Sequence, residues 1–218
     1  MNEIAIILPA LNEEKAIGFV INEIHIQPMN CDIFVADSSS TDRTAEIASS
    51  LGAFVIPGPR GKGNAVRAII PLIHHKYVFM LDADGTYPAY FLCDMLHKLE
   101  NGYQVVVGER KPVNKQSMKL YNKACNGALN FCNNFFYGGK IRDICSGMWG
   151  FQGDVLKEMA LTAPDFTLEA DICTKVCIGK YKLASVPIEY RERVGGHSKI
   201  KFKDGFKIAS VLVKRSLQ

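Results

Sequence analysis

The chain has 218 residues, of which 48% are hydrophobic and 22% charged, with a net charge of +4 and a mean hydropathy of +0.03. It contains no low-complexity tract or repeat, and it is long enough to form one sizeable core, so we expect a single domain over residues 1–218. No apolar run reaches the roughly 20 residues that span a bilayer, and no signal peptide precedes the first aliphatic run, so an intracellular protein is expected. The seven cysteines include no C-x-x-C pair and are predicted to be small buried hydrophobes in a reducing compartment.

Short aliphatic runs alternate with helical patterns through the first half of the chain. Strands are expected at Glu3–Leu8, Asp32–Asp37, Ala53–Ile56, Tyr77–Leu81 and Gln104–Gly108. Helices are expected from the Asn12-Glu13 region to about Ile26, from the possible caps at Ser38–Asp42 to Gly52, and over Gly61–His74. This alternation predicts an α/β fold in which helices cover both faces of a mostly parallel sheet.

Polar clusters follow three of the predicted strands. They are Asn12-Glu13, Asp37–Asp42 and Asp82-Ala-Asp84. In parallel sheets of this kind, ligands bind beyond the carboxyl ends of the strands. The three clusters are therefore predicted to line one ligand site.

Asp82 and Asp84 form a candidate metal site. Two carboxylates separated by one residue project to the same side of an extended chain. Mg²⁺ and Mn²⁺ bind such oxygen ligands together with substrate phosphates. The segment could equally be a simple loop, in which Asp84 starts an Asx-turn and Pro88 opens a helix.

The other clusters also have two interpretations. Asn12-Glu13 could only begin a helix, because an acidic residue favours a helix N-terminus without any ligand. Asp37 and the serines after it could be a polar loop and cap. Gly61-Lys62-Gly63 could let a loop enter the next helix, although a lysine and free amides there also suit a phosphate group.

Taken together, these segments resemble the motifs of family 2 glycosyltransferases with the GT-A fold. The matching segments, in chain order, are Pro9-x-x-Asn12-Glu13, Val35-Ala-Asp37-Ser-Ser-Ser-Thr-Asp42-x-Thr44, Gly61-Lys62-Gly63 and Asp82-Ala-Asp84. Further segments resemble the dolichyl-phosphate mannose synthase branch, which transfers a sugar from a nucleotide donor to a polyprenyl phosphate. They are Gly108-Glu-Arg110, Asp143-x-x-Ser146-Gly147 and Arg193-Val-Gly-Gly196-His-Ser198-Lys199.

The resemblance implies a role for each matching residue. The first nucleotide-binding loop would be formed by Pro9, Asn12 and Glu13, and the base would be bound by Asp37. Asp82 would face the sugar and diphosphate. Asp84 would hold Mg²⁺ or Mn²⁺, with Asp82 beside it. Lys62 and Asp143 are further expected substrate-binding residues. Arg110, Arg193, Ser198 and Lys199 match positions near the phosphates of the donor or acceptor. Among all of these, catalytic roles are expected for Asp82, Asp84, Arg110, Arg193 and Lys199.

Three residues depart from the family pattern. Ser38 replaces a common second carboxylate after Asp37, and Thr86 stands where some relatives have a metal-binding glutamine. Thr86 could still contribute a hydroxyl group. Tyr87 replaces a histidine or similar residue and could alter the same contact.

The expected reaction is inverting transfer of a sugar from a UDP- or GDP-sugar to a polyprenyl phosphate. A phosphate monoester has a second pKa of about 6, so it needs cationic positioning rather than proton removal. A soluble transferase acting on a glycan or small metabolite is the alternative, with Asp143, Glu169 or Asp171 as candidate general base. A catalytically silent protein that binds sugar nucleotides is a third possibility.

Residues 198–218 carry six basic residues and one acidic residue, a net charge of +5. Phe202, Phe206, Ala209 and Val213 would share one face of a helix, so this basic amphipathic segment is expected to place the protein peripherally on the cytoplasmic face of a membrane. Packing of its apolar stripe on the domain is the alternative. A second helix, over about Met118–Phe136, is expected in the core or beside the lipid. No nucleic-acid partner is expected.

Overall fold

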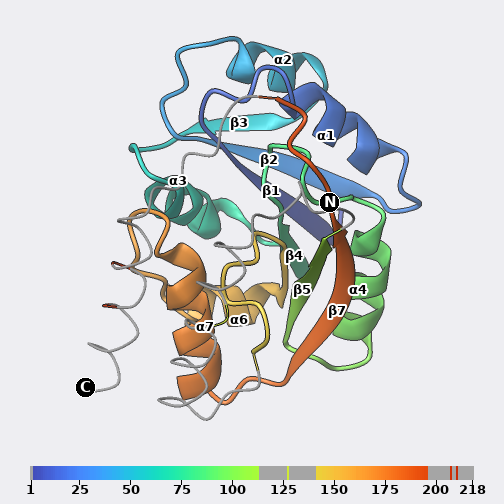
Figure 1. Ribbon diagram of the computed structural model, residues 1–218, viewed down its shortest axis with the longest axis vertical. Helices are drawn as coiled ribbons and strands as arrows, with labels where there is room; N and C mark the ends of the chain where they lie inside the picture. The colour runs from blue at the N-terminus through green and yellow to red at the C-terminus, as the bar shows by residue number, and fades with distance from the viewer. Residues whose placement is uncertain (1, 113–126, 128–140, 196–206, 208–209, 211–218) are drawn as a thin grey trace.

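The computed structural model describes residues 2–112, 127, 141–195, 207 and 210. Its seven-stranded sheet has the order β3-β2-β1-β4-β6-β5-β7 (Figure 1). The strands are β1 (Ile4–Ala10), β2 (Cys31–Asp37), β3 (Phe54–Pro57), β4 (Tyr77–Met80), β5 (Val105–Pro112), β6 (Trp149–Gln152) and β7 (Leu183–Tyr190). Only β6 runs antiparallel to its neighbours, β4 and β5. The predicted mostly parallel α/β sheet is confirmed.

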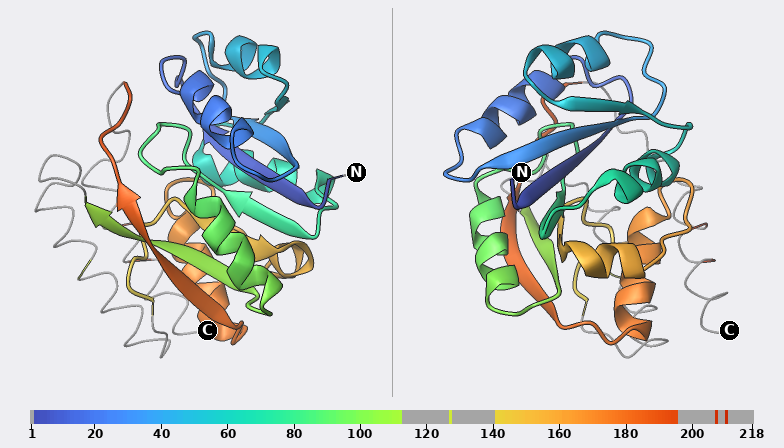
Figure 2. Two further views of the ribbon diagram at one scale, coloured as in Figure 1. Left: turned by 90° about the vertical axis from the view of Figure 1, so that its right-hand side faces the viewer. Right: turned by 180° about the vertical axis from the view of Figure 1, so that it is seen from behind.

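Helices cover both faces of this sheet (Figures 1 and 2). One face packs against α1 (Ile17–His25), α2 (Thr44–Ser50) and α4 (Phe91–Glu100), and the other against α3 (Lys62–Ile69), α6 (Gly153–Glu158) and α7 (Leu168–Ile178). Successive side chains of β1 point to opposite faces of the sheet, so Ile6 and Leu8 belong to one core cluster and Ala5 and Ile7 to the other. Both clusters are buried, so the strands are aliphatic on both sides.

The observed elements differ from the predicted ones in several respects, and α6 is one that had no predicted counterpart. The helix expected over Gly61–His74 is α3 followed by a 3-10 turn at Ile70–Leu72, because Pro71 lacks the N–H that an α-helix would require. The strands β6 and β7 had no counterpart among the predicted elements. Strand β6 has only four residues, too few for a clear periodic pattern.

Two predicted segments lie mainly outside the described residues. They are the helix over Met118–Phe136, where only Gly127 is described, and residues 198–218, where only Lys207 and Ser210 are described. The single domain over residues 1–218 therefore stays a prediction.

Candidate active site

The carboxyl ends of β1, β2 and β4 bring the three polar clusters to one edge of the sheet. Ala10 at the end of β1 is in register with Asp37 at the end of β2. On the other side of β1, the backbone N–H of Leu81 donates to the carbonyl of Ile7, which places Asp82 directly beyond β4. Parallel pairing of neighbouring strands thus assembles residues as far apart in the chain as Asn12 and Asp84.

Asn12 and Glu13 hold the loop that follows β2. Asn12 has a left-handed backbone with φ of 51°, a conformation that asparagine tolerates, and its Oδ1 accepts the backbone N–H of Thr41 at 2.8 Å. The N–H of Glu13 donates to Thr44 Oγ1 at 2.8 Å. Both residues therefore shape the region predicted to bind the nucleotide.

Asp37 is the last residue of β2, Ser38 begins the loop that follows, and both are buried. The carboxylate of Asp37 accepts the N–H of Ser40 at 3.2 Å. Ser38 Oγ accepts the N–H of Gly61 at 2.7 Å, which ties the loop after β2 to the start of α3. The departure at Ser38 therefore replaces a carboxylate with a hydroxyl that has a structural partner.

Asp84 is buried, and both of its carboxylate oxygens have partners. Oδ1 accepts the hydroxyl and N–H of Thr86 at 2.6 and 2.9 Å, while Oδ2 lies 2.6 Å from Arg193 Nη2. Burial and the neighbouring Asp82 raise the pKa of Asp84, and the Arg193 charge opposes this rise. The Asx-turn suggested by the sequence is present and uses Oδ1. Oδ2 is therefore the oxygen that contacts the positively charged Arg193.

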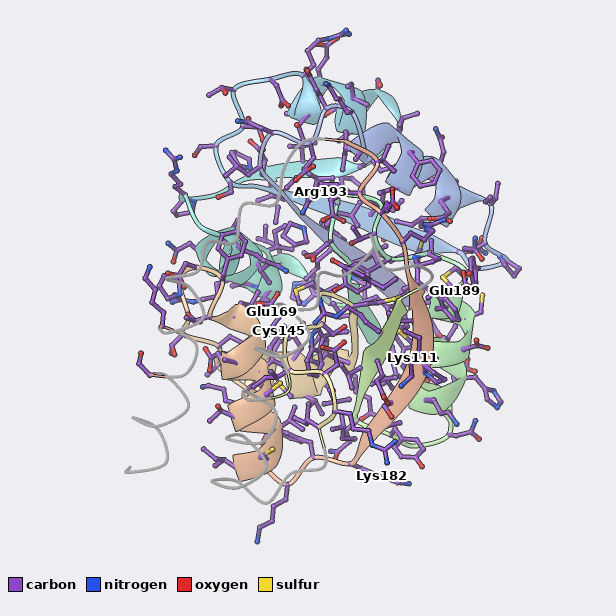
Figure 3. All side chains as sticks on the ribbon, in the orientation of Figure 1. Lys111, Cys145, Glu169, Lys182, Glu189 and Arg193 are labelled. Atoms are coloured by element: carbon purple, nitrogen blue, oxygen red, sulfur yellow. The ribbon has the colours of Figure 1, made fainter. Side chains whose placement is uncertain are left out.

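Arg193 comes from the segment after β7 (labelled in Figure 3), and its guanidinium contacts Asp84 in this loop. Its guanidinium also contacts Glu13 Oε1 at 3.1 Å, so it joins the first cluster to the third. The backbone fastens the same segment, because the N–H of Val194 donates to the carbonyl of Asp84. Gly85 has φ of 79°, and a β-carbon there would lie 2.4 Å from a methyl group of Val194. The sequence-predicted residues Glu13, Asp84 and Arg193 thus form one cluster.

Asp82 is half-buried and belongs to a second charged cluster. Its Oδ1 lies 2.5 Å from Lys62 Nζ, and the same ammonium contacts Glu169, the second residue of α7. Burial opposes the charge on Lys62, but the two carboxylates outweigh it and raise the pKa of Lys62. Burial raises the pKa of Glu169, against the effect of the lysine. The sequence predicted a substrate-binding or catalytic role for each of these three residues, but it did not indicate that they contact one another.

Arg110 and Asp143 form a buried ion pair beside these clusters. Arg110 Nε and Nη2 donate to the two carboxylate oxygens of Asp143 at 2.7 and 2.6 Å. The guanidinium lies 5.1 Å from the ring centre of Tyr190, and that ring meets Tyr87 edge-on. The Tyr87 hydroxyl accepts the N–H of Gly147 at 2.7 Å. In the structure Arg110 is therefore held by a carboxylate and an aromatic ring.

The remaining residues that the sequence predicted for the site lie in different parts of the structure. Pro9 lies within β1, and Asp171 is fully buried and accepts the N–H groups of Thr162 and Ala163 at 2.6 and 2.8 Å. Ser198 and Lys199 lie outside the described residues. Arg191, for which the sequence predicted no role, binds Glu23 through its two terminal guanidinium nitrogens, and its proximity to Arg193 in sequence was the available signal.

The chain is similar in sequence to known glycosyltransferases. The family model described as glycosyl transferase family 2 matches residues 5–160. A dolichyl-phosphate hexose transferase of Haloferax volcanii is 33% identical over 219 residues, covering 100% of this chain and 95% of the relative. Glycosyltransferase AglJ of the same organism is 34% identical over 196 residues, covering 88% of this chain and 64% of its own length.

Solved structures share the fold at lower identity. Glucosyl-3-phosphoglycerate synthase from Mycobacterium tuberculosis, in complex with Mn²⁺, UDP-glucose and phosphoglyceric acid, has a TM-score of 0.75 at 23% identity, covering 99% of this chain and 80% of that one. Mannosyl-3-phosphoglycerate synthase from Rubrobacter xylanophilus has a TM-score of 0.76 at 20% identity, covering 99% and 73%. The predicted GT-A fold is confirmed. The family match and the full-length relative together show that the chain belongs to glycosyl transferase family 2, as the sequence predicted.

Proposed function

We propose that this enzyme transfers a hexose, with inversion, from a UDP- or GDP-sugar to a polyprenyl phosphate. The main support for a phosphate acceptor is that each of the three candidate general bases is already paired with another group. Asp143 is paired with Arg110, Glu169 with Lys62, and Asp171 with backbone N–H groups. A hydroxyl acceptor needs a general base, whereas a phosphate monoester is already ionised near neutral pH. The name of the Haloferax relative supports the same acceptor.

Asp82 and Asp84 suit a divalent cation. Their carboxylate oxygens are the ligands that Mg²⁺ and Mn²⁺ prefer. Among the described residues no set of three acidic, histidine or cysteine side chains forms a metal cage, which fits a cation completed by water and donor phosphates. Arg193 already places a positive charge at Asp84 Oδ2, so this oxygen is oriented toward a cation. The Mn²⁺ named with the glucosyl-3-phosphoglycerate synthase complex supports this choice.

The chain's own residues then position the reactants. Asp37 and the Asn12 loop hold the nucleotide, and Asp82 faces the sugar and diphosphate. When bound, the cation neutralises charge that develops on the leaving diphosphate. Arg193, released from Asp84, together with Lys199 covers the phosphates, and the acceptor phosphate attacks the anomeric carbon from the opposite side.

Turnover should require the phosphate group of a lipid acceptor. With Mn²⁺ and a panel of UDP- and GDP-sugars, farnesyl phosphate should accept the hexose, while farnesol, the matched control without phosphate, should not. Product formation is measured by mass spectrometry, and release of nucleoside diphosphate is followed in parallel.

The alternatives give different results in the same assay. The solved neighbours include a complex with phosphoglyceric acid, so 3-phosphoglycerate is the competing acceptor to test. Transfer to 3-phosphoglycerate but not to farnesyl phosphate would show a transferase for small metabolites. Binding of a donor without its hydrolysis or transfer under any condition would show a silent binding protein.

We also propose peripheral attachment to the cytoplasmic face of a membrane through residues 198–218. Among the described residues, no helix combines the length and apolar character needed to cross a bilayer. A lipid acceptor nevertheless requires a route to the bilayer surface, and near an anionic leaflet each basic residue contributes about 1 kcal/mol. Lys207 is exposed, with its Nζ 3.3 Å from Asp165 Oδ2.

The protein should sediment with vesicles that contain anionic lipid at low salt and be released at about 1 M salt, where the Debye length falls to about 3 Å. Changing Lys203, Lys207 and Lys214 to glutamate should abolish sedimentation, whereas the matched change of Lys98, Lys157 and Lys180 to glutamate should not. Vesicles of neutral lipid are the second control. Equal sedimentation of both triple variants would contradict attachment through this segment.

A further inference from the structure

Glu169 occupies an unexpected position for a candidate general base. It is 7% exposed, and its carboxylate contacts the Lys62 ammonium, whose second partner is Asp82. Figure 3 labels Glu169 at the end of α7 that lies toward α3. The chain Glu169–Lys62–Asp82 therefore runs from a buried helix to the half-buried carboxylate that the proposed mechanism places at the donor.

The glycines around Lys62 explain how its ammonium reaches both carboxylates. Gly61 has φ of 112°, and a β-carbon there would lie 2.4 Å from the carbonyl oxygen of Pro164. A β-carbon at Gly63 would lie 2.1 Å from the carbonyl oxygen of Ala163. Such distances exclude any side chain unless the backbone moves. The Gly61-Lys62-Gly63 sequence thus brings the start of α3 against the backbone that leads into α7.

The segment that contacts these glycines is itself fixed. Asp171 of α7 accepts the N–H groups of Thr162 and Ala163, and the N–H of Asn64 in α3 donates to the carbonyl of Pro164 at 2.9 Å. Helices α3 and α7 are therefore joined through one short backbone segment, which sets the position of Lys62 relative to Glu169.

Asp82 is also confined by the backbone at Gly147. A β-carbon at Gly147 would lie 2.1 Å from Asp82 Oδ2, so the backbone before β6 packs directly against this oxygen. Lys62 Nζ lies 2.5 Å from the other oxygen, Oδ1. The carboxylate consequently has little freedom to rotate.

We propose that Glu169 is a positioning residue that acts on the transfer reaction through Lys62. Its carboxylate holds the ammonium in place, and the ammonium fixes the orientation of Asp82 toward the donor. Glu169 neither removes a proton from the acceptor nor touches the sugar. This inference rests on the proposed function, which places Asp82 at the donor and supplies turnover as the readout.

A double-mutant cycle between Lys62 and Glu169 tests this assignment. Glu169→Gln should lower kcat about 10- to 100-fold, because small misplacements of a catalytic group cost this much, with the donor KM changed less than about threefold. Lys62→Met should lower kcat at least as much. In the Lys62→Met background, Glu169→Gln should change kcat by less than about twofold, because the residue through which Glu169 acts is gone.

An undiminished effect of Glu169→Gln in that background would overturn the proposal, since it would show that Glu169 acts on the substrate directly. A donor KM that rises as strongly as kcat falls would also overturn it. Thermal unfolding of each variant reports its fold, and Lys62→Gln repeats the cycle with a side chain that can hydrogen bond to both carboxylates. Asp154→Asn, at an exposed carboxylate of α6, is the neutral control.

The cycle is measured as release of nucleoside diphosphate from UDP-glucose or GDP-mannose with Mn²⁺, both with farnesyl phosphate and with water as the only acceptor. If farnesyl phosphate does not increase turnover, the proposed acceptor is wrong, while the hydrolysis rates still complete the cycle. If farnesyl phosphate is used and the two substitutions act independently, the acceptor stands and the role of Glu169 is wrong.

Discussion

Replacing Asp84 with asparagine should lower turnover by about 10³-fold or more. A bound cation supplies several kcal/mol of charge stabilisation in the transition state, and each 1.36 kcal/mol corresponds to a factor of ten in rate. Asparagine keeps the size of the side chain and can still accept the N–H of Thr86, so the loop should remain folded. The rate is measured as nucleoside diphosphate release, and Mn²⁺ binding is measured by calorimetry in the absence of donor.

The matched control is Asp94→Asn, because Asp94 is an exposed carboxylate in the first turn of α4. It should leave both turnover and Mn²⁺ binding unchanged. Excess EDTA should stop the wild-type enzyme, and added Mn²⁺ should restore it. Full wild-type activity in EDTA, or an Asp84→Asn variant that binds Mn²⁺ as tightly as wild type, would contradict a metal at Asp84.

Replacing Arg193 with glutamine should change turnover and metal affinity in opposite directions. Turnover should fall about 100-fold, because a charge-assisted contact to phosphate, worth about 1.5–3 kcal/mol, is lost. Affinity for Mn²⁺ alone should rise about tenfold, because Arg193 Nη2 lies 2.6 Å from Asp84 Oδ2 and must leave before a cation binds there. A residue with only a structural role would not increase metal affinity when removed.

Arg191 provides a control from the same segment. Its guanidinium pairs with Glu23 instead of Asp84, so Arg191→Gln should leave Mn²⁺ affinity at the wild-type value. Calorimetric titration with Mn²⁺ in the absence of nucleotide makes the comparison. If Arg193→Gln binds Mn²⁺ no more tightly than Arg191→Gln, the arginine and the cation do not compete for Asp84.

Local patterns in the sequence were sufficient for the fold class and for the edge that carries the site. Aliphatic runs such as Glu3–Leu8 and Tyr77–Leu81 predicted strands because alternation and burial depend on neighbouring residues. The observed β1 and β4 lie within two residues of those bounds. Asp82 and Asp84 follow β4 directly, so the position of the candidate metal site was a consequence of local order along the chain.

Tertiary structure alone decided which charges meet. Lys62 and Glu169 are 107 residues apart, and Arg193 and Glu13 are 180 apart, so no spacing in the sequence links either pair. Their contacts depend on how α3 packs near α7 and how the segment after β7 returns to β1. The position of β6, which pairs antiparallel between β4 and β5, was likewise not predictable from the sequence, because strand order follows from long-range packing. The sequence by itself determined which chemical groups form the site and at which edge of the sheet they lie. Packing between distant elements determined which of these groups pair, since the free energy of an ion pair depends on distance and burial in space.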